Sequence, residues 1–185
     1  KDGSAGITGI SGYKAETSRY HLYISLACPW AHRTLIFRKL KGLESCIDIS
    51  VVHWLMEENG WTFKEGPGVI ADSVNHAQFM HQVYTKAKPD YTGRVTVPVL
   101  WDKKSSSIVS NESSDIIQML NSSFDSAGAS PGNYFPAELI TEMDNVNDRI
   151  YNSFNNGVYK CGFATSQKAY QDALVPLFET MDWME

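Results

Sequence analysis

The sequence lacks an excess of positive charge, long apolar runs and a signal-like opening. Lys and Arg total 16 against 21 Asp and Glu, so the net charge is −5 and the pI is near 5.5. A broad basic surface for nucleic acid or anionic membranes is therefore not expected. No apolar run approaches the roughly 18 residues of a membrane span, and Lys1 to Gly12 lack the apolar core of a signal peptide. We expect a cytoplasmic protein that binds neither nucleic acid nor a membrane.

Cysteine is also scarce. The three cysteines, Cys28, Cys46 and Cys161, are an odd number at wide and irregular spacing. This pattern suits neither a disulfide framework nor a zinc site. We therefore expect no metal and a reducing compartment.

Two polar segments divide the chain. Residues 1–18 show no hydrophobic period and predict an extended N-terminal arm, and residues 122–136 are rich in Ser, Gly and Pro, which predicts an interdomain linker. The folded parts are then expected at residues 19–121 and 137–185, which is one full domain and part of a second.

The first domain opens with the pattern of a strand, a helix and a second strand. Arg19 to Ser25 alternate as in a strand, and Pro29 suits the first turn of a helix that Gly42 ends. On this helix the apolar Ile36, Phe37 and Leu40 are expected to face the core, with Thr34, Arg38 and Lys41 on the opposite face. The strand expected at 47–52 then runs parallel to the first.

The rest of this domain predicts a hairpin and two helices. A long connection at 54–74 is expected to border a ligand site, and Asn75 is expected to cap the next helix. Strands at 97–101 and 107–110 read as an antiparallel hairpin, followed by a helix at 113–120. This order of elements is that of the thioredoxin fold, an α/β architecture.

Cys28 is the candidate catalytic residue. Cys28-Pro29-Trp30-Ala31 resembles a C-x-x-C redox turn in which alanine replaces the second cysteine. A thiol at a helix N-terminus is stabilised as the thiolate, the form that attacks disulfide or thioether sulfur. Because the turn has no resolving cysteine, an external thiol must open the covalent intermediate. The alternative is a buried, unreactive cysteine.

Two further segments could hold a peptide-like ligand. Pro98 opens a strand, where a cis bond would leave the Val97 backbone free to pair with such a ligand; a trans proline at a strand start is the alternative. Glu112 and Ser113 lie where a strand passes into a helix, so Ser113 could hold a carboxylate and Glu112 an ammonium group. A plain helix cap is the alternative there.

Three single residues carry weaker signals. Trp61 and Arg94 are weak candidates for the ligand site. The alternatives are that Trp61 is a packed aromatic side chain and that Arg94 is a solvated charge. His32 could act as a base near Cys28, although a surface histidine is the commoner case.

The sequence resembles the glutathionyl-hydroquinone reductases, also called Xi-class glutathione transferases. The segments that carry the resemblance are YHLYISLACPWAHRTLIFRKL at 20–40, ENGWTF at 58–63, GRVTVPVLWDK at 93–103, VSNES at 109–113 and NNGVYKCGF at 155–163. The resemblance implies a thioredoxin-like N-terminal domain followed by an all-α glutathione-transferase C-terminal domain. It also implies glutathione as co-substrate and a homodimer.

The resemblance further implies particular residue roles. Cys28 would be the nucleophile that reduces glutathionyl-hydroquinones through a mixed disulfide with glutathione, with Pro29 and Pro98 structural at the site. The implied glutathione-binding residues are Trp61, Arg94, Val97, Glu112 and Ser113. An omega-like glutathione transferase with thioltransferase or dehydroascorbate reductase activity is the near alternative, and a non-catalytic assembly module is the distant one.

The second domain is expected to be incomplete. Two helices are predicted, one marked by residues 139–154 and one by residues 170–181 with Pro176 inside it, and the family continues well beyond this chain. The quinol pocket is therefore inferred from the family alone. The apolar face with Leu174, Leu177, Phe178 and Met181 is expected to pack on another chain or on a longer form of the protein.

Overall fold

The computed structural model describes residues 12–185, which divide into two units, residues 12–134 and 135–185. Of the arm expected at 1–18, residues 1–11 lie outside the described part. The remainder is bonded to the first unit, since Arg19 Nη1 and the Tyr20 hydroxyl both donate to Lys14 O, at 3.3 and 2.8 Å. The described end of the arm is thus anchored by side chains at the start of the sheet.

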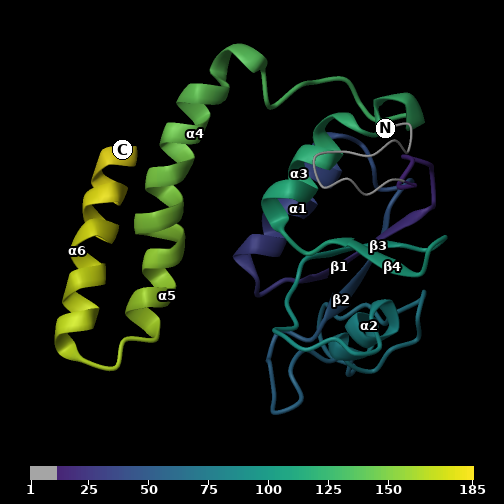
Figure 1. Cartoon of the computed structure of the whole chain (residues 1–185), viewed down its shortest axis with the longest axis horizontal. Helices are drawn as coiled ribbons and strands as arrows, with labels where there is room; N and C mark the ends of the chain where they lie inside the picture. Colours follow the sequence, from purple (N-terminus) through teal and green to yellow (C-terminus); the bar gives the residue numbers. More distant parts are fainter. Residues whose placement is uncertain (1–11) are drawn as a thin grey trace. The chain divides into compact units, whose positions relative to one another are not determined.

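A four-stranded mixed sheet lies at the centre of the first unit (Figure 1). Its order is β2–β1–β3–β4, where the strands are β1 (Tyr20–Ser25), β2 (Asp48–Val52), β3 (Val99–Asp102) and β4 (Ser107–Ser110). β1 is parallel to β2 and antiparallel to β3, and β3 is antiparallel to β4. The expected parallel pair and the expected hairpin are both confirmed.

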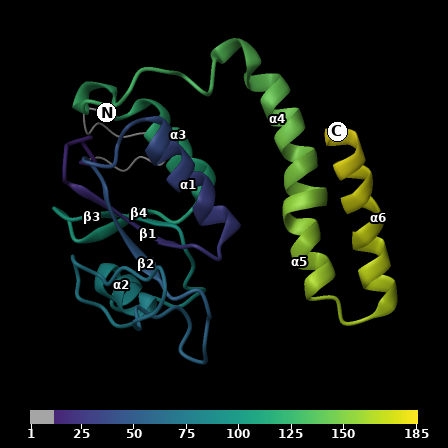
Figure 2. The ribbon, with the colours of Figure 1, turned by 180° about the vertical axis from the view of Figure 1, so that it is seen from behind.

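Helices cover both faces of the sheet. Figures 1 and 2 show α1 (Pro29–Leu40) and α3 (Ser113–Ser122) on one face and α2 (Met80–Ala87) on the other. Leu22, Ile24, Val99 and Trp101 of the sheet are fully buried between these layers. The thioredoxin-like order of elements is therefore confirmed.

The predicted core face of α1 was wrong. Ala31 and Thr34 are the buried residues of this helix, whereas Ile36 and Leu40 are each 44% exposed. Thr34 tolerates burial because its hydroxyl donates to Ala31 O at 2.6 Å, which leaves its methyl group for the core. A helix that lies close on a sheet favours such small residues at the contact.

The start of α2 also differs from the prediction. The helix begins at Met80 rather than after Asn75, because the Gln82 side chain accepts a hydrogen bond from Phe79 N at 3.0 Å. The preceding turn is organised by Asp72, whose carboxylate accepts from the N–H groups of Val74, Asn75 and Ala77. Asp72 therefore holds the turn that Asn75 was expected to begin.

The segment expected as a linker, 122–136, lies mostly within the first unit. Lys41 is 1% exposed, and its ammonium group donates to Asp125 Oδ1 at 3.2 Å and to Gly132 O at 2.8 Å. Ser130 N donates in turn to Lys41 O at 2.8 Å. Burying this charged group requires such partners, so they fix the segment on the unit up to residue 134.

The second unit is helical. It contains α4 (Ile140–Arg149), a π-helical stretch (Ile150–Asn155), α5 (Asn156–Gly162) and α6 (Gln167–Met184), which includes Pro176. Leu177 packs on Gly157, where an added Cβ would lie 3.3 Å from Leu177 Cδ1. Of the expected apolar face, Leu177 is buried while Phe178 and Met181 are exposed.

Within residues 12–185, no helix is long and apolar enough to cross a membrane. No group of three or more His, Cys, Asp and Glu side chains in that range is arranged to hold a metal ion.

Candidate functional site

Cys28 lies at the N-terminal end of α1. Its backbone is extended, with φ −100° and ψ 112°, and Pro29 is the first helical residue. Proline suits that position because its missing N–H has no partner in the first turn anyway. No side chain caps this helix, and its first turn carries no acidic residue. The positive end of the helix dipole therefore acts on the half-buried thiol without a competing carboxylate from the same turn.

The segment before β3 reaches the same thiol. Cys28 Sγ donates to Val97 O at 3.4 Å, although the two residues are 69 positions apart. The Val97–Pro98 bond is cis, which decides between the two alternatives left open by the sequence, and both residues are buried. The backbone beside the thiol thus lies just before β3, outside the strand ladder, where a peptide-like ligand could pair with it.

Glu112 and Ser113 meet at the start of α3. Glu112 is the residue that caps this helix, since its Oε1 accepts from Ser114 N at 3.2 Å, and Ser113 is the first helical residue. The capping alternative, in which Ser113 followed by Asp115 caps the helix, is therefore wrong by one residue, because Glu112 is the cap and Ser113 is buried inside the first turn.

Arg33 is a member of this site that the sequence reasoning missed. Its Nε and Nη2 both donate to Ser113 Oγ, at 3.0 and 2.6 Å, and Nη2 lies 3.7 Å from Glu112 Oε1. Nothing in the sequence marks a contact across 80 positions. The two donated bonds occupy the lone pairs of Ser113 Oγ, so its O–H remains available as a donor.

Among residues 12–185 the Ser113 hydroxyl has only a poor acceptor. Its nearest partner is Glu112 Oε1 at 3.4 Å, which is long for an O–H···O bond. A ligand carboxylate beside Ser113 would be a better acceptor and would also lie next to the Arg33 cation. The Glu112 side chain is 59% exposed, so its carboxylate can accept from an ammonium group while Oε1 caps α3.

Trp61 and Arg94 are not joined to this cluster by the contacts within residues 12–185. Trp61 is half-buried against the core, and its carbonyl accepts from Met80 N at 2.9 Å. Arg94 is exposed, and its carbonyl accepts from the Tyr91 hydroxyl at 2.7 Å. Their assignment to a glutathione site stays a prediction. His32 is exposed, and its backbone N–H donates to Cys28 O at 3.1 Å.

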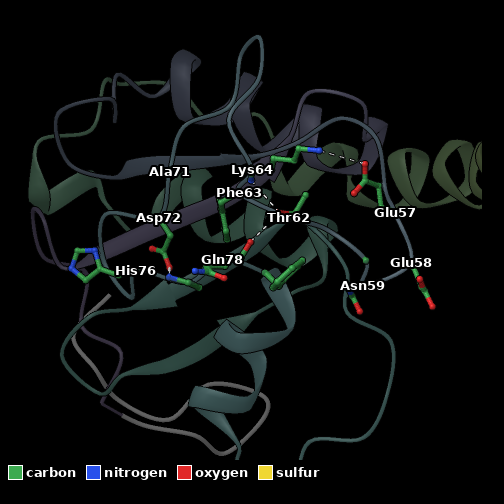
Figure 3. A pocket seen from close by; sticks show the side chains of 13 residues that line it. Glu57, Glu58, Asn59, Thr62, Phe63, Lys64, Ala71, Asp72, His76 and Gln78 are labelled. Atoms are coloured by element: carbon green, nitrogen blue, oxygen red, sulfur yellow. Dashed lines mark hydrogen bonds and ion pairs between the residues drawn. The ribbon is translucent and has the colours of Figure 1, made fainter.

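A pocket of about 670 Å³ lies in the long connection before α2, as Figure 3 shows. Gly60 and Thr62 line it, but Trp61 between them does not, nor do Cys28 or Ser113. Asp72 on its wall already accepts the Tyr23 hydroxyl at 2.8 Å as well as backbone N–H groups. The pocket therefore includes none of the residues predicted to bind glutathione.

The arrangement points to one kind of chemistry. The Cys28 thiol lies beside the Val97 backbone, and a cation from α1 meets a hydroxyl donor and a carboxylate at the start of α3. These groups match a small thiol peptide that carries a free amino group and a free carboxylate at one end.

Comparison with known proteins agrees with this reading. The model of the glutathione S-transferase N-terminal domain matches residues 27–123. Glutathionyl-hydroquinone reductase PcpF of Sphingobium chlorophenolicum is 57% identical over 175 residues, which cover 95% of this chain and 56% of the relative. Glutathionyl-hydroquinone reductase YqjG of Escherichia coli K12 is also 57% identical, over 100% of this chain and 56% of its own length.

Solved structures give the same result. The glutathione-bound structure of YqjG from Escherichia coli K-12 superposes with a TM-score of 0.97 at 57% identity, over 99% of this chain and 60% of that one. Glutathione transferase Xi 1 from Trametes versicolor has a TM-score of 0.91 at 51% identity, over 94% and 61%. The chain thus spans little more than half the length of the curated relatives it matches.

Proposed function

Because this chain belongs to the glutathione S-transferase family, we propose that its protein reduces glutathionyl-hydroquinones to hydroquinones with glutathione as the reductant. The two curated relatives at 57% identity carry that activity in their names. The observation that carries the proposal is Cys28, which lies at an uncapped helix N-terminus with its Sγ 3.4 Å from Val97 O beside a cis proline.

The site contains a single thiol. Ala31 takes the place of a second cysteine in the turn and is fully buried. All three cysteines are free, and neither Cys46 nor Cys161 lies in the redox turn. An intermediate on Cys28 must therefore be resolved by a thiol from solution, which is the role we assign to glutathione.

Glutathione would be held by groups from three segments. The backbone of Val97 would pair with the peptide, Glu112 would accept from the γ-glutamyl ammonium group, and Ser113 would donate to the neighbouring carboxylate. Arg33 supports the last contact through its bonds to Ser113 Oγ. Trp61 and Arg94 are assigned to the same ligand by the family resemblance, and Pro29 and Pro98 shape the site.

The reaction has two balanced steps. The Cys28 thiolate attacks the sulfur of the glutathionyl-hydroquinone, an S–S bond forms, and the carbon–sulfur bond breaks with its electron pair going to the ring carbon. That carbon is protonated and the hydroquinone leaves. A glutathione thiolate then attacks the mixed disulfide, so that oxidised glutathione is released and the Cys28 thiolate returns. The two sulfurs are oxidised and the ring carbon is reduced.

The direct test is mass analysis of Cys28. The intact protein is mixed with one equivalent of glutathionyl-hydroquinone without free glutathione, and is then digested. The proposal expects one glutathionyl group on the peptide with Cys28, its removal by added glutathione, and release of hydroquinone in the first step. An unmodified Cys28 together with unchanged substrate would overturn it.

An omega-like thioltransferase remains the second candidate, because a relative from Schizosaccharomyces pombe named glutathione S-transferase omega-like 2 is 45% identical over 94% of this chain. Both reactions pass through glutathionylated Cys28 and differ in the leaving group. The two activities are separated by measuring the turnover rate on glutathionyl-hydroquinone, on a small glutathione mixed disulfide and on dehydroascorbate. The rate on glutathionyl-hydroquinone should be the highest.

We also propose that the protein works in the cytoplasm as a homodimer. The three free cysteines fit a reducing compartment. Light scattering on the intact protein at micromolar concentration tests the dimer, and fractionation of the source cells tests the location.

A further inference from the structure

Two segments of the proposed glutathione site leave the sheet at the same end of one hairpin. Thr96 to Pro98 precede β3, and Asn111 to Ser113 follow β4. The last ladder pair between these strands is Leu100 with Ser110. Beyond that pair the ladder no longer fixes the distance between the two segments.

The hydroxyl of Tyr84 joins these segments. It donates to Thr96 O at 2.9 Å and accepts from Asn111 Nδ2 at 3.1 Å and from Thr96 N at 3.3 Å. The Thr96 hydroxyl lies 3.3 Å away as well. A phenol offers one donor and two acceptor positions, so this group is saturated. Thr96 directs both of its backbone polar groups to Tyr84.

The core fixes the position of this hydroxyl. Tyr84 is 2% exposed and lies on α2, where Met80 and Val83 are fully buried. Its ring packs on Tyr91 with the centroids 4.9 Å apart. A tyrosine so placed loses little further entropy when it holds the two segments.

We propose that Tyr84 is a positioning residue for glutathione, because its hydroxyl fixes the segment with Val97 relative to the segment with Glu112 and Ser113. The inference rests on the proposed glutathione site. Tyr84 touches no reacting atom and acts through Thr96 and Asn111. It should therefore govern affinity for glutathione, while the reactivity of Cys28 depends on α1.

The first test is Tyr84→Phe in the intact protein, with Tyr20→Phe as the matched control. The Tyr20 hydroxyl is also buried and bonded to backbone, at Lys14 O, but it touches neither segment. We expect Tyr84→Phe to raise the Kd and KM for glutathione about tenfold. The kcat at saturating glutathione and the iodoacetamide labelling rate of Cys28 should stay within about twofold of wild type. Tyr20→Phe should leave all four quantities unchanged.

The second test uses Asn111→Ala, an exposed position that should fold normally, alone and combined with Tyr84→Phe. If the hydroxyl acts as a bridge, Asn111→Ala raises the Kd severalfold and adds little in the double variant. Additive effects, or wild-type glutathione affinity in Tyr84→Phe, would overturn the inference while leaving the proposed function intact. A wild-type protein that binds no glutathione would overturn both.

Discussion

The two units bury their apolar side chains to very different degrees. Every fully or nearly buried hydrophobic residue of residues 12–185 lies in the first unit except Leu177. The second unit exposes large side chains along its helices, among them Tyr151, Phe163 at 79% and Phe178. The first unit thus has a core that can hold a site in place, while the second depends on helix propensity and a few contacts between helices.

This difference assigns separate roles to the units. The thiol and the cluster around Ser113 are both fixed by elements whose other face is buried in the first unit. Precise geometry of this kind requires rigid support. We therefore expect changes in the first unit to alter chemistry and stability strongly, and changes of the same type in the second unit to alter them little.

The largest expected contrast is between two cysteines. Cys28→Ser should lower turnover of glutathionyl-hydroquinone more than about 10³-fold, since a serine hydroxyl is not ionised at neutral pH. Glutathione affinity should stay within about threefold because the binding groups remain. Cys161→Ser in α5 is the matched control and should keep wild-type turnover. Comparable losses from both variants would move the chemistry out of the first unit.

The next contrast concerns packing. Leu22 in β1 is fully buried, so Leu22→Ala should lower the free energy of unfolding by about 4 kcal/mol. Phe178 in α6 is 53% exposed in the 185-residue chain, and Phe178→Ala in that chain alone should cost less than about 1 kcal/mol. Urea unfolding followed by circular dichroism gives both values. A larger cost at Phe178 would show that its face is covered in the intact protein.

Acid should weaken the first unit through His21. Burial lowers the pKa of His21 to about 4. Its Nε2 lies 2.8 Å from Ser50 Oγ, and its Nδ1 is buried with no hydrogen-bond partner among residues 12–185. The folded state keeps this ring neutral while the unfolded chain takes up a proton below pH 6.5. Stability is thus lost as the pH falls from about 6.5 to about 4, by about 3 kcal/mol in total.

His21→Gln should remove that part of the pH dependence. The measurement is urea unfolding at several pH values for wild type, His21→Gln and the control His76→Gln, which changes an exposed histidine. Wild type and His76→Gln should lose stability in parallel across this window. If the His21→Gln curve fell equally steeply, the loss would belong to other groups.

How far the sequence predicts the molecule depends on the range of each interaction. The strands and the helix that starts at Pro29 follow from local patterns, and the structure confirms them, whereas the local pattern at Pro98 left cis and trans open and the structure shows the bond to be cis. The buried face of α1 was mispredicted because Thr34 satisfies its own hydroxyl and so replaces an apolar residue. A hydropathy pattern cannot show this burial, because it assigns one value to threonine whether or not the hydroxyl is hydrogen-bonded.

The site divides in the same way. Cys28 and Glu112 stand next to helix starts, so their sequence neighbours reveal them. Arg33 and Tyr84 act on residues 80 and 27 positions away, and nothing near either residue in the chain marks the contact. Long-range side-chain bonds of this kind appear only when the fold is known.

The smallest expected contrast compares two arginines. Arg38 on α1 donates to Ile47 O at 2.6 Å and to Glu44 O at 3.0 Å. Arg38→Met leaves these partly buried carbonyls without a donor, which should cost about 2 kcal/mol.

Arg149 on α4 stacks over Trp183 of α6 at 4.3 Å from the ring centroid and donates to Glu179 O at 3.3 Å. Both of those contacts are exposed, so Arg149→Met should cost only about 0.5 kcal/mol. Hydrogen exchange resolves the two effects by segment: Arg38→Met should speed exchange through the first unit, whereas Arg149→Met should speed it about twofold and only in α4 and α6. Slower or unchanged exchange in α4 after Arg149→Met would mean that the stacking contact does not hold the two helices together.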